Sequence, residues 1–289
     1  DKYRGGRFMS KKQKMTAVVL SQEKIAEDIY SMWLKAEPIA AEAVPGQFIS
    51  MYTNDGGKLL PRPISLCEID QEKGALRVVY RVTGKQTGTE QFSLMKEGDT
   101  LDVMGPLGNG FTVEPGKKAF LIGGGIGFDL ETGREKKAML FGGGIGVPPM
   151  LELAKQLKAG YQTECQLVMG YRSETFLTKE LEENGTLYIA TEDGSTGTKG
   201  NVMDAVAANS LEADVIYACG PTPMLRAIKQ YAEENKIECY ISMEERMACG
   251  VGACLGCVCQ SKEVDHHSHV HNKRVCKDGP VFLATEVEL

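Results

Sequence analysis

The sequence lacks long hydrophobic runs, an excess of positive charge and an apolar segment near its start. No stretch of 18 or more apolar residues occurs, so a membrane-crossing helix is not expected. The net charge of -6 argues against nucleic acid as the main partner, because phosphate binding depends on a basic surface. The basic start DKYRGGRFMSKKQK has no apolar region behind it and does not resemble a secretory signal. We therefore expect a soluble, cytoplasmic protein in which residues 1–14 are a disordered extension or a cloning remnant and Met9 or Met15 is the natural start.

Glycine and cysteine, by contrast, are abundant. The 33 glycines exceed the usual share of about 7%, which indicates close backbone approaches of the kind that cofactor sites need. Five of the nine cysteines, at positions 249, 254, 257, 259 and 276, fall in the last 41 residues. This clustering predicts a metal site in a reducing compartment. Cys67, Cys165 and Cys239 lie in apolar runs and are expected to be small buried hydrophobes.

The segment from residue 15 to about residue 115 contains short β-rich runs separated by turn sequences such as PGQ, NDGG and EGDT. Strands that recur at this spacing, without a long helix, predict a small antiparallel barrel. The runs are residues 16–22, 30–36, 47–53, 62–69 and 76–82.

Residues 116–242 follow a different pattern, in which strands alternate with helices. This alternation predicts a doubly wound parallel sheet covered on both faces, where ligands bind beyond the carboxyl ends of the strands. The last segment, residues 243–289, is too small to be held together by apolar burial, so a metal centre would have to supply the missing stability. The predicted strands are 138–141, 165–172, 187–193, 214–220 and 238–243, and the predicted helices are 148–160, 178–184, 202–209 and 223–235.

The cysteine-rich segment carries Cys249-x4-Cys254-x2-Cys257 in MACGVGACLGCVC, and Cys276 follows in RVCKDGPVF. This is the spacing of plant-type 2Fe-2S proteins, in which four thiolates bind two irons. The intervening glycines allow the loop to wrap closely and to point backbone N–H groups at the sulfurs, which helps to set the reduction potential.

Other readings of this segment remain open. A structural zinc site made of four cysteines also uses a CxxC pair, although the x4-x2 spacing is more specific. Cys259 could replace Cys257 as a ligand, but it breaks that spacing. All four histidines, at positions 266, 267, 269 and 271, lie in DHHSHVHNK. A His-rich run can bind metal, but a solvated hairpin between the third and fourth cysteine ligands is the favoured interpretation.

The barrel segment contains RPIS at residues 62–65. An Arg can bind a pyrophosphate bidentately, and a Ser hydroxyl three residues later can hydrogen-bond a ring nitrogen, although a surface salt bridge would also explain Arg62. The stretch Val79-Tyr80-Arg81 offers a flat aromatic ring and a second cation. The turn Thr87-Gly88-Thr89 offers free N–H groups.

In the α/β segment, CGPTPM at residues 219–224 makes a sharp strand-to-helix turn at the carboxyl edge of the sheet. A thiol at Cys219 would lie where a nicotinamide and a flavin meet, and a buried strand-end cysteine is the alternative. Arg172 follows the second strand, where a 2'-phosphate contact would lie, or it pairs with Glu174. These residues leave NAD and NADP both open.

The sequence GGGIG occurs twice, at 123–127 and 142–146, within the near-repeats KKAFLIGGGIG and KKAMLFGGGIG. The second copy leads into VPP and an amphipathic helix. Proline suits the first turn of a helix, and the N–H groups at a helix start can face phosphates. After the first copy only about ten residues remain before the next strand, too few for a helical crossover. We predict that the second copy binds the nucleotide and that the first is a surface excursion or hairpin.

The order RPIS, GGGIG and CGPTPM resembles the ferredoxin-NADP reductase superfamily. With MACGVGACLGC and RVCKDGPVF added, the chain from about Met15 onward resembles the electron-transfer subunits of B-type dihydroorotate dehydrogenases, which have one glycine copy. The resemblance implies an FAD-binding barrel, an NAD-binding α/β domain and a 2Fe-2S module. It also implies a heterotetramer, two of each subunit, with an FMN-bearing catalytic partner that oxidises dihydroorotate to orotate in pyrimidine biosynthesis.

The expected site residues form three sets. By resemblance FAD would contact Arg62, Pro63, Ile64, Ser65, Val79, Tyr80, Arg81, Gly88 and Thr89. The glycine loop and the CGP turn contribute Gly142, Gly143, Gly144, Gly146, Cys219, Gly220 and Pro221 to the nucleotide site. The iron ligands would be Cys249, Cys254, Cys257 and Cys276. Ser65 and Cys219 would lie near the junction of flavin and nicotinamide.

The implied chemistry fits these parts. A nicotinamide exchanges two electrons as a hydride, whereas an iron-sulfur cluster takes one, so a flavin is expected between them. Proximity and orientation carry the rate, and no catalytic acid or base is expected. The rivals are another flavin-linked NAD(P)H reductase, such as an oxygenase reductase or a ferredoxin-NADP oxidoreductase small subunit, and a non-enzymatic nucleotide sensor stabilised by zinc.

Overall fold

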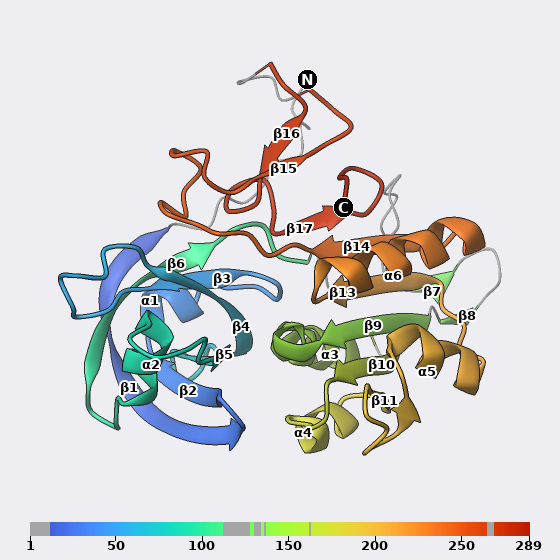
Figure 1. Ribbon diagram of the computed structural model, residues 1–289, viewed down its shortest axis with the longest axis horizontal. Coiled ribbons are helices and arrows are strands. Elements are labelled where there is room, and N and C mark those ends of the chain that lie inside the picture. The colour runs from blue at the N-terminus through green and yellow to red at the C-terminus, as the bar shows by residue number, and fades with distance from the viewer. Residues whose placement is uncertain (1–11, 112–127, 130–133, 136, 162, 265–268) are drawn as a thin grey trace.

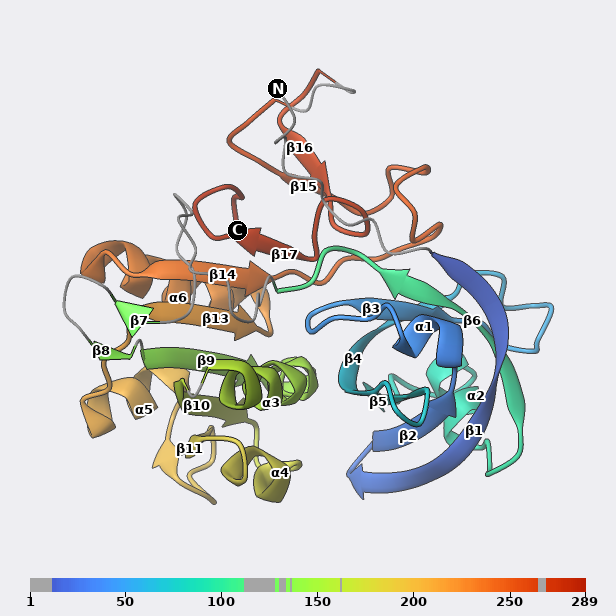
Figure 2. The same cartoon turned by 180° about the vertical axis from the view of Figure 1, so that it is seen from behind.

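The computed structural model describes residues 12–111, 128–129, 134–135, 137–161, 163–264 and 269–289. A β barrel and a helix-covered sheet lie side by side, and the carboxyl-terminal segment runs across the top of both in the view of Figure 1. Seen from behind, the same segment still lies over the junction of the two parts (Figure 2).

The barrel is closed by six antiparallel strands in the order β1-β2-β5-β4-β3-β6. Inward residues alternate with outward ones, so Ala17 and Val19 are buried while Val18 between them is exposed. The structure corrects the sequence expectation at both ends of this segment. Residues 13–14, expected to belong to a disordered extension, are part of β1, and a sixth strand, over residues 100–107, was not foreseen. The strands are β1 (Gln13–Ala26), β2 (Ile29–Lys35), β3 (Phe48–Met51), β4 (Arg62–Asp70), β5 (Ala75–Arg81) and β6 (Thr100–Leu107).

Short helices accompany the barrel strands, α1 (Glu37–Ala40) and α2 (Gly88–Ser93). The helix α2 starts where Thr87 accepts a hydrogen bond from the backbone N–H of Glu90, which satisfies one of the free donors at a helix start. Its Phe92 is almost fully buried and packs edge-on against Tyr80 in the barrel core.

The second part is a sheet of seven strands in the order β12-β11-β10-β9-β13-β14-β17, in which every pairing but the last is parallel. The expected α/β alternation is confirmed. The strands are β9 (Lys137–Gly143), β10 (Glu164–Tyr171), β11 (Thr186–Thr191), β12 (Thr198–Lys199), β13 (Val215–Cys219) and β14 (Glu238–Ser242), and the helices are α3 (Pro148–Tyr161), α4 (Thr178–Glu182), α5 (Val202–Asn209) and α6 (Thr222–Asn235).

The carboxyl-terminal segment is built into the rest of the molecule. Its strands β15 (Val258–Gln260) and β16 (Asn272–Arg274) form a hairpin, while β17 (Val281–Leu283) adds antiparallel to β14. One buried apolar cluster contains Phe48 and Leu107 of the barrel together with Cys257, Cys276 and Phe282. The expectation that this segment has too little apolar burial of its own is therefore incomplete, because it shares a core with both larger parts.

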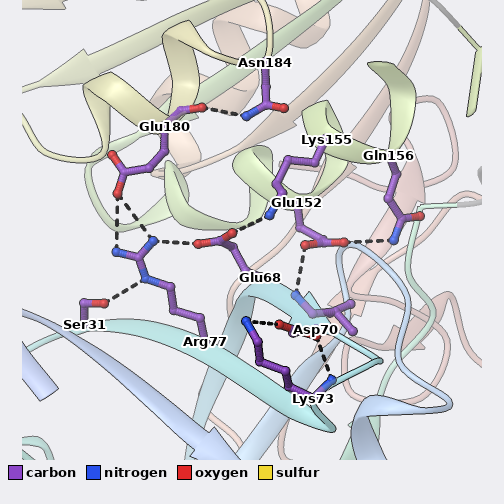
Figure 3. Close-up of polar contacts among 11 residues, drawn as sticks. Ser31, Glu68, Asp70, Lys73, Arg77, Glu152, Lys155, Gln156, Glu180 and Asn184 are labelled. Carbon is purple, nitrogen blue, oxygen red and sulfur yellow. Dashed lines mark hydrogen bonds and ion pairs between the residues drawn. The ribbon is translucent and has the colours of Figure 1, made fainter. Parts of the chain in front are cut away.

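A polar seam joins the barrel to α3 and α4 (Figure 3). Arg77 of β5 contacts Glu68 of β4 at 2.6 Å and Glu180 of α4 at 3.4 Å, and its Nε donates to the Ser31 hydroxyl at 2.8 Å. Lys155 of α3 contacts the other oxygen of Glu68 at 2.5 Å. These contacts bridge the two parts at the point where α3 packs against β4.

Short strands β7 (Phe128–Asp129) and β8 (Arg134–Glu135) pair antiparallel between the glycine copies. The first copy, residues 123–127, lies outside the described residues, so the prediction for it stays a prediction. Over the described part of the chain, no helix is both long and apolar enough to cross a membrane.

Candidate functional site

A cavity of about 800 Å³ opens between the barrel and the carboxyl edge of the sheet. The barrel contributes Arg81 and residues 26–29, and the sheet contributes the ends of β9 and β10 and the loop after β11. This is the edge at which α/β sheets bind their ligands. Among the residues proposed from the sequence, those that line the cavity are Arg81, Gly143, Gly144, Arg172 and Pro221.

The second glycine copy lies at this edge of the sheet, where β9 ends. Gly142 and Gly143 end β9, residues 144–146 form a single 3-10 turn, and Pro148 starts α3. A Cβ placed on Gly146 would lie 2.2 Å from the carbonyl oxygen of Cys219, so only glycine lets these two turns approach each other. Strand, tight turn and proline-started helix thus follow one another as the sequence predicts.

Cys219 ends β13 between Gly142 of β9 and Ser242 of β14. Its side chain is 1% exposed, and burial raises the pKa of the thiol well above its ordinary value. The thiol is therefore enclosed, and the position of Cys219 near the junction of flavin and nicotinamide stays a prediction. The following Pro221 is the residue of this turn that reaches the cavity.

Two of the barrel segments expected to contact FAD, the flavin motif RPIS at residues 62–65 and the turn at residues 87–89, lie next to each other. A Cβ placed on Gly88 would lie 3.0 Å from Nε of Arg62, so the guanidinium lies against the start of α2. Nη1 of Arg62 donates a hydrogen bond to the carbonyl oxygen of Leu60 at 2.5 Å. Within the described residues the Arg62 guanidinium forms no ion pair. Thr89 is buried, and its hydroxyl accepts a hydrogen bond from the backbone N–H of Thr83 at 3.3 Å.

The segment Val79-Tyr80-Arg81, also expected to contact FAD, differs from the sequence expectation. Tyr80 was expected to offer a flat ring to a ligand, but its ring is 1% exposed, is parallel to Tyr30 and donates its hydroxyl to Gln22. Strand alternation points Tyr80 into the barrel and its neighbours outward. Any contact from Tyr80 to a ligand would therefore come from its backbone, whereas the Arg81 side chain reaches the glycine loop, 3.8 Å from where a Cβ of Gly144 would lie.

The cysteine loop surrounds its own sulfurs with backbone donors. Sγ of Cys249 accepts hydrogen bonds from the N–H groups of Val251, Ala253 and Cys254 at 3.3–3.5 Å. Sγ of Cys276 accepts one from Gly252 at 3.1 Å. Such N–H groups favour thiolates, which are the iron-binding form.

The four thiols contact one another in pairs, and their surroundings make the pairs unequal. Burial alone would raise the pKa of Cys249, but the surrounding N–H groups and the Cys254 thiol lower it to about 6. Burial, followed by the Cys257 thiol, raises the pKa of Cys276 to about 12. No three His, Cys, Asp or Glu side chains are grouped as a site for a single ion within the described ranges. The donors and the paired thiols fit a two-iron cluster.

Cys259 lies beyond this loop, on the strand that follows Cys257. It lies on β15, is 8% exposed, and burial raises its pKa to about 11. The predicted hairpin between the third and fourth cysteines is confirmed by the pairing of β15 with β16. His269 and His271 are exposed on its connection, while His266 and His267 lie outside the described residues.

Two further details concern the cavity. Arg172 lines the cavity. The carboxylate of Glu174, its alternative partner, accepts a hydrogen bond from the backbone N–H of Glu27 at 2.7 Å. Sequence reasoning missed Glu244, which follows β14. Burial raises the pKa of this carboxyl against the lowering effect of the Arg81 guanidinium, and the Glu244 charge adds to the burial that raises the pKa of Cys219. No local motif marks that residue.

Barrel, nucleotide cavity and cysteine loop together define a flavin- and nicotinamide-binding oxidoreductase with an iron-sulfur module. Family models agree along the chain: an oxidoreductase FAD-binding domain matches residues 16–111, an oxidoreductase NAD-binding domain matches 140–230, and the iron-sulfur cluster binding domain of dihydroorotate dehydrogenase B matches 244–288. The last match overturns the zinc alternative for the cysteine segment.

The chain belongs to the family of electron transfer subunits of dihydroorotate dehydrogenase B. It is 40% identical over 277 residues to the NAD(+) enzyme's electron transfer subunit from Caldanaerobacter subterraneus subsp. tengcongensis, covering 95% of this chain and 98% of that one. It is 42% identical to the same subunit from Bacillus caldolyticus, covering 96% and 99%.

Solved structures extend the likeness. An NADH-dependent reduced ferredoxin-NADP oxidoreductase matches with a TM-score of 0.78 at 29% identity, covering 94% of this chain and 89% of that one. The ferredoxin reductase of a carbazole 1,9a-dioxygenase matches with a TM-score of 0.61 at 22% identity, covering 78% and 67%, which shows a shared fold alone.

Proposed function

We propose that this protein carries electrons between a dihydroorotate-oxidising partner subunit and NAD, through a 2Fe-2S cluster and FAD. The observation that carries the proposal is the shared core of the cysteine loop and the barrel. Phe48 of β3 and Leu107 of β6 pack in one buried cluster with Cys257 and Cys276. The loop therefore lies against the strands next to the flavin motif, which shortens the path for single electrons.

Bound between these sites, FAD supplies the change from two-electron to one-electron transfer. The chain's own residues bind and orient. Arg62, beside the start of α2, would hold the FAD pyrophosphate. The second glycine copy and Pro221 would hold the nucleotide at the sheet edge, with Arg81 at the border between the two ligands. The four thiolates at positions 249, 254, 257 and 276 would hold the irons.

The partner in this proposal is an FMN-bearing catalytic subunit, with two copies of each chain in the complex. The names of the relatives support a partner, since they are called electron transfer subunits of dihydroorotate dehydrogenase B (NAD(+)). Thiolate ligands must stay reduced until they bind iron, which supports a cytoplasmic location.

A matched pair of variants tests the electron path. Cys254→Ser removes an expected iron ligand, whereas Cys259→Ser makes the same change at a cysteine on β15 of the same module. With the partner present, Cys254→Ser is expected to lose orotate-dependent NADH oxidation and to keep NADH-dependent ferricyanide reduction through FAD. Cys259→Ser should keep both activities. Orotate-dependent turnover by a Cys254→Ser complex without its cluster would refute the proposal.

The second candidate is a ferredoxin-linked NAD(P)H reductase, which the 0.78 TM-score to a ferredoxin-NADP oxidoreductase favours. The two functions differ in what the cluster serves. If the isolated chain reduces ferredoxin rapidly with NADH and no FMN-bearing subunit copurifies with it, the second candidate replaces the first.

A further inference from the structure

One buried hydroxyl has no partner. Ser50 is 1% exposed, and it is the buried side-chain polar atom in the described part of the chain for which no hydrogen bond is formed. An unsatisfied buried hydroxyl costs about 1–3 kcal/mol. Such a group calls for a hydrogen-bond partner that the described polypeptide does not supply.

The position of Ser50 identifies where that partner must lie. On β3 its residue pairs with Pro63 of the flavin motif on one side and with Met104 of β6 on the other. A Cβ placed on Gly250, the residue after Cys249, would lie 3.1 Å from Oγ of Ser50. The hydroxyl thus sits between the flavin motif and the start of the cysteine loop.

The other two atoms nearest to the Cβ position of Gly250 are apolar. The same point above Gly250 lies 3.1 Å from Cδ1 of Leu107 and 3.4 Å from Cε of Met104. Pro63 has no N–H to offer. Gly250 has a φ of +67°, a left-handed conformation that brings its backbone close to the barrel without a side chain between them. The contact is therefore tight, and what reaches it from the module is the loop that carries Cys249.

We propose that the Ser50 hydroxyl donates a hydrogen bond to a sulfur of the iron-sulfur centre at the Cys249 side, and so raises the reduction potential of that centre. The inference rests on the proposed function only in requiring the cluster. Reduction adds negative charge to the cluster, and a hydrogen-bond donor aimed at its sulfurs stabilises the reduced form. A single side chain of the barrel would then help to set the difference in reduction potential between the cluster and the flavin.

The test uses the purified protein with its FAD and cluster, and the variant Ser50→Ala. The cluster potential is measured by a redox titration followed by electron paramagnetic resonance, with flavin absorbance recorded at the same potentials. We expect a roughly tenfold loss in the equilibrium for cluster reduction, which for one electron is a shift of about 59 mV to lower potential. The flavin potential should not change.

A control and a direct readout complete the design. Ser261→Ala removes a buried hydroxyl of the same module whose partner is the carbonyl oxygen of Glu263, so it should leave the cluster potential unchanged. After exchange into D2O, a deuteron coupled to the reduced cluster should be present in the wild type and in Ser261→Ala, and one such coupling should disappear in Ser50→Ala.

An unchanged cluster potential in Ser50→Ala overturns the proposal. A shift of the flavin potential alone also overturns it, because the flavin would then be the acceptor. These measurements need no partner subunit. A lost orotate activity with an intact Ser50 effect would thus count against the proposed function and leave this inference standing.

Discussion

Replacing Arg77 by Leu should be strongly destabilising, because this guanidinium is the centre of the seam between barrel and sheet (Figure 3). Its side chain is 8% exposed and that of Glu68 is 13% exposed, so both charges are largely removed from water. Removing one partner of a buried pair costs about 3–5 kcal/mol, since the other charge stays buried. Lys155 remains with Glu68, and we therefore expect the lower end, about 3 kcal/mol.

The assay is urea unfolding followed by flavin fluorescence, because release of FAD reports loss of the barrel site. Lys14→Ala is the control, since it removes an ion pair to Asp102 whose side chains are 54% and 44% exposed, and such pairs contribute about 0.2–1 kcal/mol. Replacing both Arg77 and Glu68 by Leu should recover part of the loss, because the buried carboxylate that only Lys155 compensates in Arg77→Leu is then gone.

Two results would refute this reasoning. If Arg77→Leu costs no more than Lys14→Ala, the seam contributes no more than an exposed ion pair. If the double replacement is less stable than Arg77→Leu, the charge left at Glu68 is not the source of the loss.

Three further predictions concern the second half of the molecule. Gly146→Ala should destabilise the nucleotide site by about 3 kcal/mol, because its Cβ would meet the Cys219 carbonyl at 2.2 Å; Gly160→Ala on α3 meets nothing within 4 Å and should gain about 0.5–1 kcal/mol in thermal unfolding. Burial raises the pKa of the Glu152 carboxyl in the folded state. The stability that this carboxyl contributes while it is protonated is therefore lost as the pH rises from its ordinary value of 4.5 through its folded-state value. Glu152→Gln should remove that loss, and unfolding curves from pH 4 to pH 8 that stay parallel for both proteins would contradict this. Deleting residues 117–135 should leave flavin reduction by NADH largely intact in stopped-flow absorbance; loss of reduction in a folded deletion variant would assign the nucleotide to the first glycine copy.

Patterns that are local in sequence predicted their structures well. The apolar positions of α3, such as Leu151, Ala154 and Leu157, recur at helical spacing, and all are fully buried. The GGGIG-to-proline transition likewise depends on residues that follow one another in the chain. Each of these features is fixed by backbone geometry within a few residues, so the sequence is sufficient to find it.

Features that depend on pairing across the chain were missed. The strand β6 contains Gly105 and Pro106, which disguise it as a turn, and its identity depends on pairing with β1 and β3. The ring of Tyr80 was read as a ligand surface although strand alternation with buried Val78 places it inside. Ser50 carries no signal at all, because its isolation is a property of the assembled contact.

The antiparallel addition of β17 to β14 has a consequence for the edge of the sheet. A strand at a sheet edge exposes unpaired N–H and C=O groups that can pair with another molecule. Residues 281–283 cover part of the edge formed by β14 (Glu238–Ser242). A chain shortened before residue 244 would thus lose the expected iron ligands and would also leave the backbone groups of β14 unpaired along one edge. Such a fragment is expected to self-associate even when FAD and NAD can still bind.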